Sequence, residues 1–193
     1  MSDNPIFRPL VAAIVVALLQ TAFLGYMIES RASILRSGVD VVLKTVPVDP
    51  RALLRGDYVI LAYDISTIPA DKITGGFPTE AMDAQLSVRL EKQPDDFWGV
   101  AEAAFGPLAS KDGSVIARSA PFYFYPTPDN PPSSLNVEYG IERYYVPEGE
   151  GRVLEQARNA SALAVTASVD DDGRMQIRVI SIDGKPLYEE PLY

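Results

Sequence analysis

The strongest constraint on this chain is an apolar run near its N-terminus, Leu10–Met27. Its 18 residues carry no charge, and only Gln20 and Thr21 are clearly polar. A helix needs about 20 apolar residues to cross the hydrocarbon core of a bilayer, and the run reaches this length once Ile28 is added. We therefore expect a single transmembrane helix that contacts the lipid bilayer through residues 10–28.

A cleaved signal peptide and a buried core helix are the alternatives to a retained anchor. Cleavage requires small residues after a short apolar core, and Ser30-Arg31-Ala32 is a poor match to that pattern. Arg8 precedes the run while Arg31 and Arg36 follow it, so the positive-inside rule leans only slightly toward a cytoplasmic domain. A short lead before an anchor and a downstream domain is the usual signal-anchor layout, which predicts a domain in the periplasm.

The chain divides into an N-terminal tail with the anchor helix, residues 1–36, and a soluble domain, residues 37–193. The helix should continue to Ser37 and end at Gly38, a residue that suits a helix C-terminus. Sixteen prolines and thirteen glycines indicate many turns and short elements. We predict an α+β fold for the whole chain, in which the domain is β-rich, mainly antiparallel and has one short helix.

Alternating and β-branched patterns locate the expected strands. Residues 64–84 lack such a pattern and contain Gly75-Gly76 and Phe77-Pro78, so a long surface loop is expected there. Residues 148–158 have the only good helical pattern in the domain, with Val153, Leu154 and Ala157 as its apolar stripe. The expected strands are 39–46, 57–63, a half-buried 84–91 with its hairpin partner 97–104, 114–120, 135–139, 141–146, and a hairpin of 161–169 with 174–182.

Composition excludes several classes of function. The chain has neither cysteine nor histidine, which removes disulfides, thiol nucleophiles, Cys/His zinc sites and Ser-His triads. Its net charge of −9 argues against binding nucleic acid, whose phosphates require a basic surface. A phosphate-binding loop and a dinucleotide fingerprint are also missing from the sequence. We therefore expect no cofactor and no metal, and an enzyme here would have to use carboxylates, Lys, Tyr, Ser or Thr.

The densest group of unusual residues lies between Pro47 and Tyr63. Asp49 and Pro50 can begin a helical turn that places Arg51 and Arg55 on one side. A strand over 57–63 then puts Asp57, Val59, Leu61 and Tyr63 on one face and Tyr58, Ile60 and Ala62 on the other. Because both faces are apolar in the middle, the pattern predicts an interior strand covered on both sides.

Residues Gly56-Asp57-Tyr58-Val59-Ile60-Leu61-Ala62-Tyr63 match the pattern G-D-Y-x-x-L-x-Y at every fixed position. The chain resembles the GDYXXLXY-domain family of bacterial membrane-anchored proteins. A second block, from Tyr139 to Gly151, is also similar to that family, and the resemblance extends over roughly residues 37–190. It implies a protein of the bacterial inner membrane with a membrane-protein partner of several spans, because such domains resemble products encoded beside, or fused to, proteins of that kind.

The candidate binding residues lie in these two blocks. Arg51 and Arg55 with Asp57 could bind an anion or a carboxylate, and a structural Arg–Asp bridge that fixes the turn is the alternative. Tyr58 and Tyr63 could line a pocket or simply pack.

Glu142 and Tyr145 are the candidates from the second block. Glu142 could join Glu148 and Glu150 in acid/base chemistry or a Ca²⁺ site, or the latter two could stabilise a helix start. Residues 122–125 could form a partner surface or be a strand with aromatic residues on both faces.

The sequence favours a non-enzymatic accessory or interaction module that works with a membrane-protein partner and binds no nucleic acid. The alternatives are a hydrolase or lyase that uses carboxylates or tyrosines, and a sensor of a small ligand. No catalytic residue can be named from the sequence.

Overall fold

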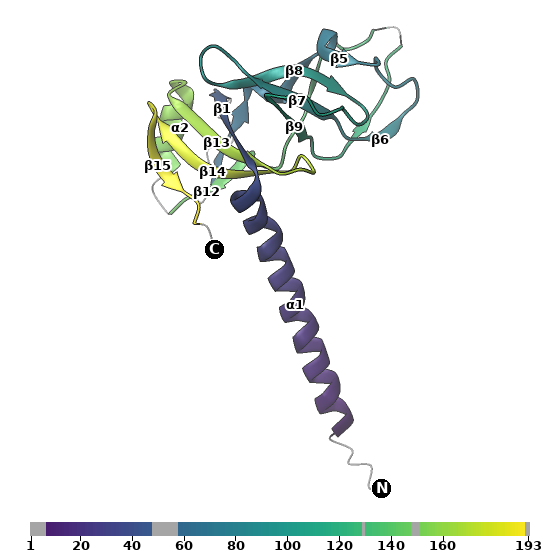
Figure 1. Cartoon of the computed structure of the whole chain (residues 1–193), viewed down its shortest axis with the longest axis vertical. Coiled ribbons are helices and arrows are strands. Elements are labelled where there is room, and N and C mark those ends of the chain that lie inside the picture. The colour runs from purple at the N-terminus through teal and green to yellow at the C-terminus, as the bar shows by residue number, and fades with distance from the viewer. Residues whose placement is uncertain (1–6, 48–57, 129, 148–150, 192–193) are drawn as a thin grey trace.

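The computed structural model describes residues 7–47, 58–128, 130–147 and 151–191. Its first element is a long helix, α1 (Phe7–Ser37), which projects from a β-rich domain (Figure 1). The helix is long and apolar enough to cross a membrane, and its most apolar stretch is not buried by the rest of the described chain. The expected α+β class and the extension of the helix to Ser37 are therefore confirmed.

The last turns of α1 are part of the domain. Ala32, Ile34 and Leu35 are buried, whereas the preceding apolar residues are exposed. The helix contacts the strands β13 (Leu163–Val169) and β14 (Met175–Ile182). Burial of these three side chains fixes the direction in which the helix leaves the domain.

Gly38 connects α1 directly to β1 (Val39–Val46). Its N–H donates to the carbonyl oxygen of Ile34 at 2.9 Å. A Cβ at this position would lie 2.6 Å from that same oxygen and 3.0 Å from the carbonyl oxygen of Val169. The helix therefore ends at Gly38 as predicted, and the specific requirement for glycine is the close approach of two backbone carbonyl groups.

Replacing Gly38 by Ala should destabilise the domain by about 1–3 kcal/mol, because the new methyl group overpacks a junction whose neighbours are backbone atoms. Urea unfolding of the full chain in detergent, followed through the fluorescence of the single tryptophan, Trp98, would measure the loss. Gly106→Ala is a matched control, since nothing lies within 4 Å of the corresponding Cβ. Equal effects of the two substitutions would contradict the steric explanation.

The larger sheet has five antiparallel strands in the order β15-β14-β13-β1-β3. Its edges are β15 (Lys185–Glu189) and the short β3 (Ala62–Tyr63). The predicted hairpin of β13 and β14 is confirmed, and its turn contains Gly173 with a φ of 80°. Alternate residues of β1 and β13, such as Leu43 and Val165, are fully buried, which places the core on one face of this sheet.

The second sheet has four strands in the order β5-β8-β7-β9, and it includes the predicted hairpin of β7 and β8. The expectation that the first strand of this hairpin is half-buried is wrong, because Ser87 to Leu90 are all buried. The segment around Ala109 covers the other face of β7. There, the carbonyl oxygen of Ala109 accepts a hydrogen bond from Arg89. Buried aliphatic side chains from both sheets form one cluster. The strands are β5 (Ile73–Thr74), β7 (Ser87–Lys92), β8 (Trp98–Ala104) and β9 (Ser114–Arg118).

The region 64–84 is not the predicted surface loop. It contains two 3₁₀ turns and three short strands, and Ile65, Ile68 and Ile73 lie in the core. These three isoleucines are too widely and irregularly spaced to give a strand or helix period. The sequence pattern therefore does not predict the short elements of this region. These elements are η2 (Asp64–Ser66), β4 (Thr67–Pro69), η3 (Ala70–Lys72), β5 and β6 (Met82–Ala84).

The predicted strand over 57–63 is divided at Leu61 into β2 (Tyr58–Ile60) and β3. Its residues 58–63 alternate in burial as predicted, with Val59, Leu61 and Tyr63 inside. The expectation of full cover on both faces is wrong, because Tyr58, Ile60 and Ala62 are only half-buried. The two halves pair with different partners, β2 with β12 and β3 with β1.

Three two-stranded ladders complete the domain: β10 with β6, β11 with β4, and β12 with β2. The strand-like segments expected at 135–139 and 141–146 correspond to β11 and β12, which are shorter than predicted. The remaining bounds are β10 (Phe122–Phe124), β11 (Ser134–Asn136) and β12 (Arg143–Tyr145).

The short helix α2 (Gly151–Asn159) is present where helical periodicity predicted it. Leu154 and Ala157 are buried as predicted. Val153 is 55% exposed, so its predicted place in the buried apolar stripe is wrong. Arg158 occupies a buried position at the end of the helix, where its Nη1 donates to the carbonyl oxygen of Ile60. A charged residue therefore links α2 to β2.

Candidate functional site

The candidate binding residues fall into three groups in the structure. Arg51, Arg55 and Asp57 lie outside the described residues, so their proposed anion site has no structural description. Tyr63 and Glu142 lie at the contact between the two sequence blocks. Tyr58 and Tyr145 face each other on paired strands. Of the carboxylates expected near Glu142, Glu148 and Glu150 also lie outside the described residues.

Tyr63 is 1% exposed, and its hydroxyl donates to the carbonyl oxygen of Ile141 at 2.7 Å. Burial, with a smaller contribution from the charge of Glu142, raises the pKa of the Tyr63 hydroxyl well above its ordinary value. A neutral, buried hydroxyl that is already bonded to the backbone is poorly suited to bind a ligand or to act as a base. The position of Tyr63 is that of a packing residue.

Glu142 organises the turn that precedes β12. Its Oε1 accepts the backbone N–H of Tyr139 at 2.5 Å, and its Oε2 accepts that of Gly140 at 2.9 Å. Gly140 has a φ of 82°, a left-handed conformation that favours glycine. The Glu142 carbonyl also accepts the N–H of Leu61 at 2.8 Å. Both carboxylate oxygens of Glu142 are therefore committed to local structure.

Tyr58, Arg143 and Tyr145 form a surface that we call the Tyr58–Tyr145 surface. Tyr145 lies directly opposite Tyr58 in the β12–β2 ladder, and their ring centroids are 5.8 Å apart at 55°. The guanidinium carbon of Arg143 lies 5.9 Å from the centroid of the Tyr58 ring. Tyr145 is 71% exposed. The result is an aromatic pair, half-buried at Tyr58 and exposed at Tyr145, with a cation beside it.

The two sequence blocks are thus one structural unit. β2 pairs with β12 in antiparallel register, Ile60 with Arg143, Val59 with Tyr144 and Tyr58 with Tyr145. A family model described as "GDYXXLXY protein" matches residues 20–180, which is most of the chain. The chain belongs to the GDYXXLXY family. No curated protein and no solved structure matches it.

The described fixed positions of the GDYXXLXY motif have different environments. Leu61 and Tyr63 point into the core, where Tyr63 holds the second block through Ile141. Tyr58 points outward and forms the Tyr58–Tyr145 surface. Sequence reasoning missed Arg143, although the spacing of Arg143 and Tyr145 places both on one face of a strand. The motif therefore combines core positions with one surface position.

An apolar pocket of about 180 Å³ lies elsewhere in the domain. The rings of Phe77 and Phe124 stack with centroids 5.9 Å apart and planes 3° apart. On β10, Phe124 points inward while Tyr123 is exposed, so this strand has aromatic residues on both faces. Among the described residues, the pocket has no charged lining residue; it is lined by Phe77, Pro78, Thr79, Phe124, Pro126, Thr127, Pro128, Pro131 and Pro132.

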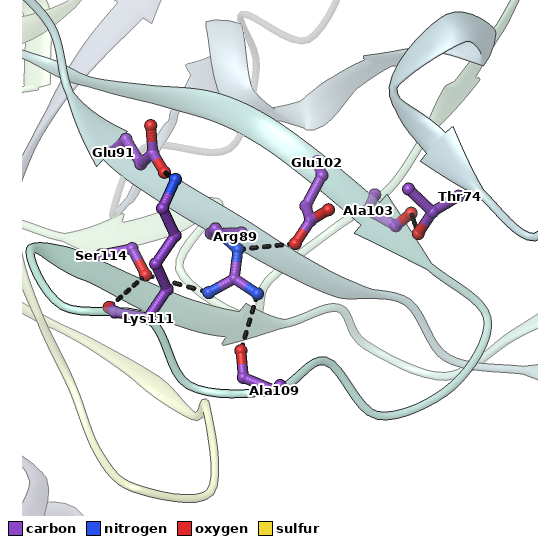
Figure 2. A network of polar contacts seen from close by, with 8 residues as sticks. All are labelled: Thr74, Arg89, Glu91, Glu102, Ala103, Ala109, Lys111 and Ser114. Carbon is purple, nitrogen blue, oxygen red and sulfur yellow. Dashed lines mark hydrogen bonds and ion pairs between the residues drawn. The ribbon is translucent and has the colours of Figure 1, made fainter.

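The most buried charge in the second sheet is Arg89, 5% exposed on β7 (Figure 2). Its Nε donates to Glu102 Oε1 at 2.6 Å, its Nη1 to Ser114 Oγ at 3.0 Å, and its Nη2 to the carbonyl oxygen of Ala109 at 2.6 Å. Lys111 and Glu91 form an adjacent ion pair at 2.7 Å. Because all three guanidinium nitrogens of Arg89 are bonded within the domain, this network is structural.

Within the described residues, no group of three or more Asp and Glu side chains could hold a metal ion. Burial raises the pKa of the Tyr139 hydroxyl, which donates to the carbonyl oxygen of Ile65 at 2.9 Å. Burial and the nearby charge of Glu190 likewise raise the pKa of Tyr144. Raised values keep these hydroxyls neutral, so they do not supply a base near neutral pH. The Tyr58–Tyr145 surface is the strongest functional candidate.

Proposed function

We propose that the protein is a single-pass, inner-membrane-anchored interaction module whose periplasmic domain binds a membrane protein of several spans. The Tyr58–Tyr145 surface carries the proposal. Tyrosine and arginine are enriched at the centres of protein interfaces, because they offer large contact areas and directed hydrogen bonds at low entropic cost. β12 also lies on the side of the domain from which α1 leaves (Figure 1), a position that faces membrane neighbours when α1 spans a bilayer.

The direct junction between α1 and β1 supports this proposal. With Ser37, Gly38 and Val39 consecutive and Ala32, Ile34 and Leu35 buried, the domain has no flexible linker to the helix. The orientation of the domain is thereby tied to that of the helix. A surface held close to the bilayer in a fixed orientation meets loops of a membrane protein at high effective concentration.

Photo-crosslinking in living cells tests the proposed interaction. A photoreactive residue at Tyr145 should form an adduct with one membrane protein of several spans, whereas one at Tyr125 should not. Tyr125 is a matched control because it is 74% exposed, against 71% for Tyr145. Arg143→Ala should lower the Tyr145 adduct by about fivefold or more, the loss expected for an interface hot spot. Equal adducts from both positions, or adducts only with lipid, would refute the proposed surface.

The orientation of the domain needs a separate experiment. A reporter that is active only outside the cytoplasm should be active when fused after Tyr193. Activity of a fusion that works only in the cytoplasm would place the domain on the other side. That result would leave the anchor intact and refute the periplasmic location.

The apolar pocket favours a second candidate function, the sensing of a small neutral ligand. A cavity of 150 Å³ is known to accommodate benzene, and the pocket here has about 180 Å³ with stacked phenylalanine rings and rigid prolines around it. Calorimetric titration with indole should give saturable binding that Phe77→Ala abolishes. An absence of saturable heat would remove this candidate. The hydrolase or lyase alternative gains no support from Tyr63 or Glu142, whose polar atoms are bonded to the backbone.

A further inference from the structure

Gln20 is the polar residue nearest the centre of the apolar run. It is one position from Leu19, the midpoint of residues 10–28. Its side-chain amide has two N–H donors and a carbonyl acceptor, and this amide makes no hydrogen bond with any of the residues that the structure describes. The neighbouring Thr21 differs, because its hydroxyl donates to the carbonyl oxygen of Ala17 at 2.9 Å. Within the described part of the apolar run, Gln20 therefore carries side-chain N–H donors without an acceptor, whereas the one donor of Thr21 is satisfied.

An amide without a partner is unfavourable in hydrocarbon, at roughly 2–7 kcal/mol depending on the reference state. The domain cannot relieve this cost, since the first residue of α1 that it buries is Ala32 and it covers none of the most apolar stretch. Ala32 lies 12 positions after Gln20 on the helix, about 18 Å away at 1.5 Å per residue. A partner for Gln20 must therefore come from another helix within the membrane.

The helix offers a suitable face for such a contact. With 3.6 residues per turn, Ala13, Ala17 and Leu24 lie on the same side as Gln20. The two alanines allow another helix backbone to approach closely one and two turns before the amide. Val15 and Ala22 lie on the opposite side. All of these side chains are exposed in the structure.

We propose that α1 forms a parallel two-helix contact with α1 of a second copy of the chain, in which the two Gln20 amides hydrogen-bond to each other. A second copy has an amide at the same depth by symmetry, and an amide is both donor and acceptor, so two of them satisfy each other across a two-fold axis. This inference rests on the membrane anchor of the proposed function, and it leaves the Tyr58–Tyr145 surface free for a different partner.

Cysteine crosslinking tests the contact cleanly, because the full chain contains no cysteine of its own. Single cysteines would be introduced as Ala13→Cys, Ala17→Cys and Leu24→Cys on the proposed face, and as Val15→Cys and Ala22→Cys on the opposite face. After mild oxidation of native membranes, the first three should give disulfide-linked dimers several-fold more than the last two. Equal yields on the two faces, or adducts with another protein in place of the dimer, would overturn the proposal.

Substitution of Gln20 tests the hydrogen bond itself. In the Ala17→Cys chain, Gln20→Leu should lower the dimer yield about threefold or more, as expected for an interhelical bond of about 0.6–2 kcal/mol. Gln20→Asn keeps both donor and acceptor and should retain most of the yield. An unchanged yield with Gln20→Leu would show that the amide does not hold the contact.

Extraction of the membranes at alkaline pH separates the two possible failures. If the chain is released as a peripheral protein, the anchor fails, and the proposed function and this inference fail together. If the chain stays in the membrane but crosslinks equally on both faces, only the helix pairing is refuted.

Discussion

Arg89→Ala should destabilise the domain by about 2–4 kcal/mol, because it removes a buried side chain with three hydrogen bonds, although Glu102 is 35% exposed and can be partly hydrated. The substitution leaves Glu102, Ser114 and the carbonyl oxygen of Ala109 without their donor, and it opens a cavity beside β7. Such a loss is a large part of the 5–15 kcal/mol by which domains are usually stable. Urea unfolding of the full chain in detergent, with Trp98 as the fluorescent probe, would measure it.

Lys111→Ala is the matched control within the same network. The Lys111 side chain is 64% exposed, so water screens its ion pair with Glu91 and the substitution should cost far less stability than Arg89→Ala. Glu102→Gln keeps an acceptor for Arg89 and should give an intermediate loss, which preserves the test if Arg89→Ala fails to fold. Losses for Arg89→Ala and Lys111→Ala that agree within error would contradict a structural role for the buried guanidinium group.

Strong local periodicity made much of the fold predictable. The Val-rich β1, the hairpin of β13 and β14, and the hairpin of β7 and β8 all follow from alternation bounded by turn residues. Prediction failed where burial depends on distant segments. β7 reads as half-buried from its sequence, yet its polar face is covered by the chain near Ala109, which lies 20 residues from Arg89.

The same reasoning explains which parts of the site were predictable. Periodicity separates Tyr58 from Tyr63 correctly, because neighbouring strand positions point to opposite faces. It cannot show that the Tyr63 hydroxyl meets the carbonyl of Ile141, a contact between residues 78 positions apart. The pairing of Tyr58 with Tyr145, and with it the role of Arg143, likewise depends on a ladder between two distant segments.

The apolar run of α1 shows the opposite case, because its hydrogen-bonding groups can be identified from the sequence without any tertiary contact. Composition alone places one amide near the middle of an apolar helix. The structure adds that the domain joins this helix without a linker and covers none of the apolar stretch. Pairing of α1 with a second copy would then fix the relative orientation of two domains and hence of two Tyr58–Tyr145 surfaces.

Stability should fall steeply as pH rises above 10, because two buried tyrosines, Tyr63 and Tyr139, remain protonated in the folded domain. Burial raises the pKa of both hydroxyls above the value of about 10 that they have in the unfolded chain. Above pH 10 the unfolded state therefore binds fewer protons than the folded state. The stability that the two buried hydroxyls contribute is fully present below pH 10 and decreases as the pH rises further. Through the two groups together, the free energy of unfolding should fall by about 3 kcal/mol between pH 9 and pH 11.

Unfolding in urea at a series of pH values would measure this slope. The double substitution Tyr63→Phe with Tyr139→Phe removes both ionisable hydroxyls and should flatten the pH dependence, although it lowers stability at neutral pH by removing two buried hydrogen bonds. Tyr123→Phe is the control, because this ring is 64% exposed and its hydroxyl meets water in both states. The slope of stability against pH, and not the absolute stability, distinguishes the outcomes. If the double variant loses stability above pH 10 as steeply as the parent chain, ionisation of Tyr63 and Tyr139 does not cause the loss of stability at high pH.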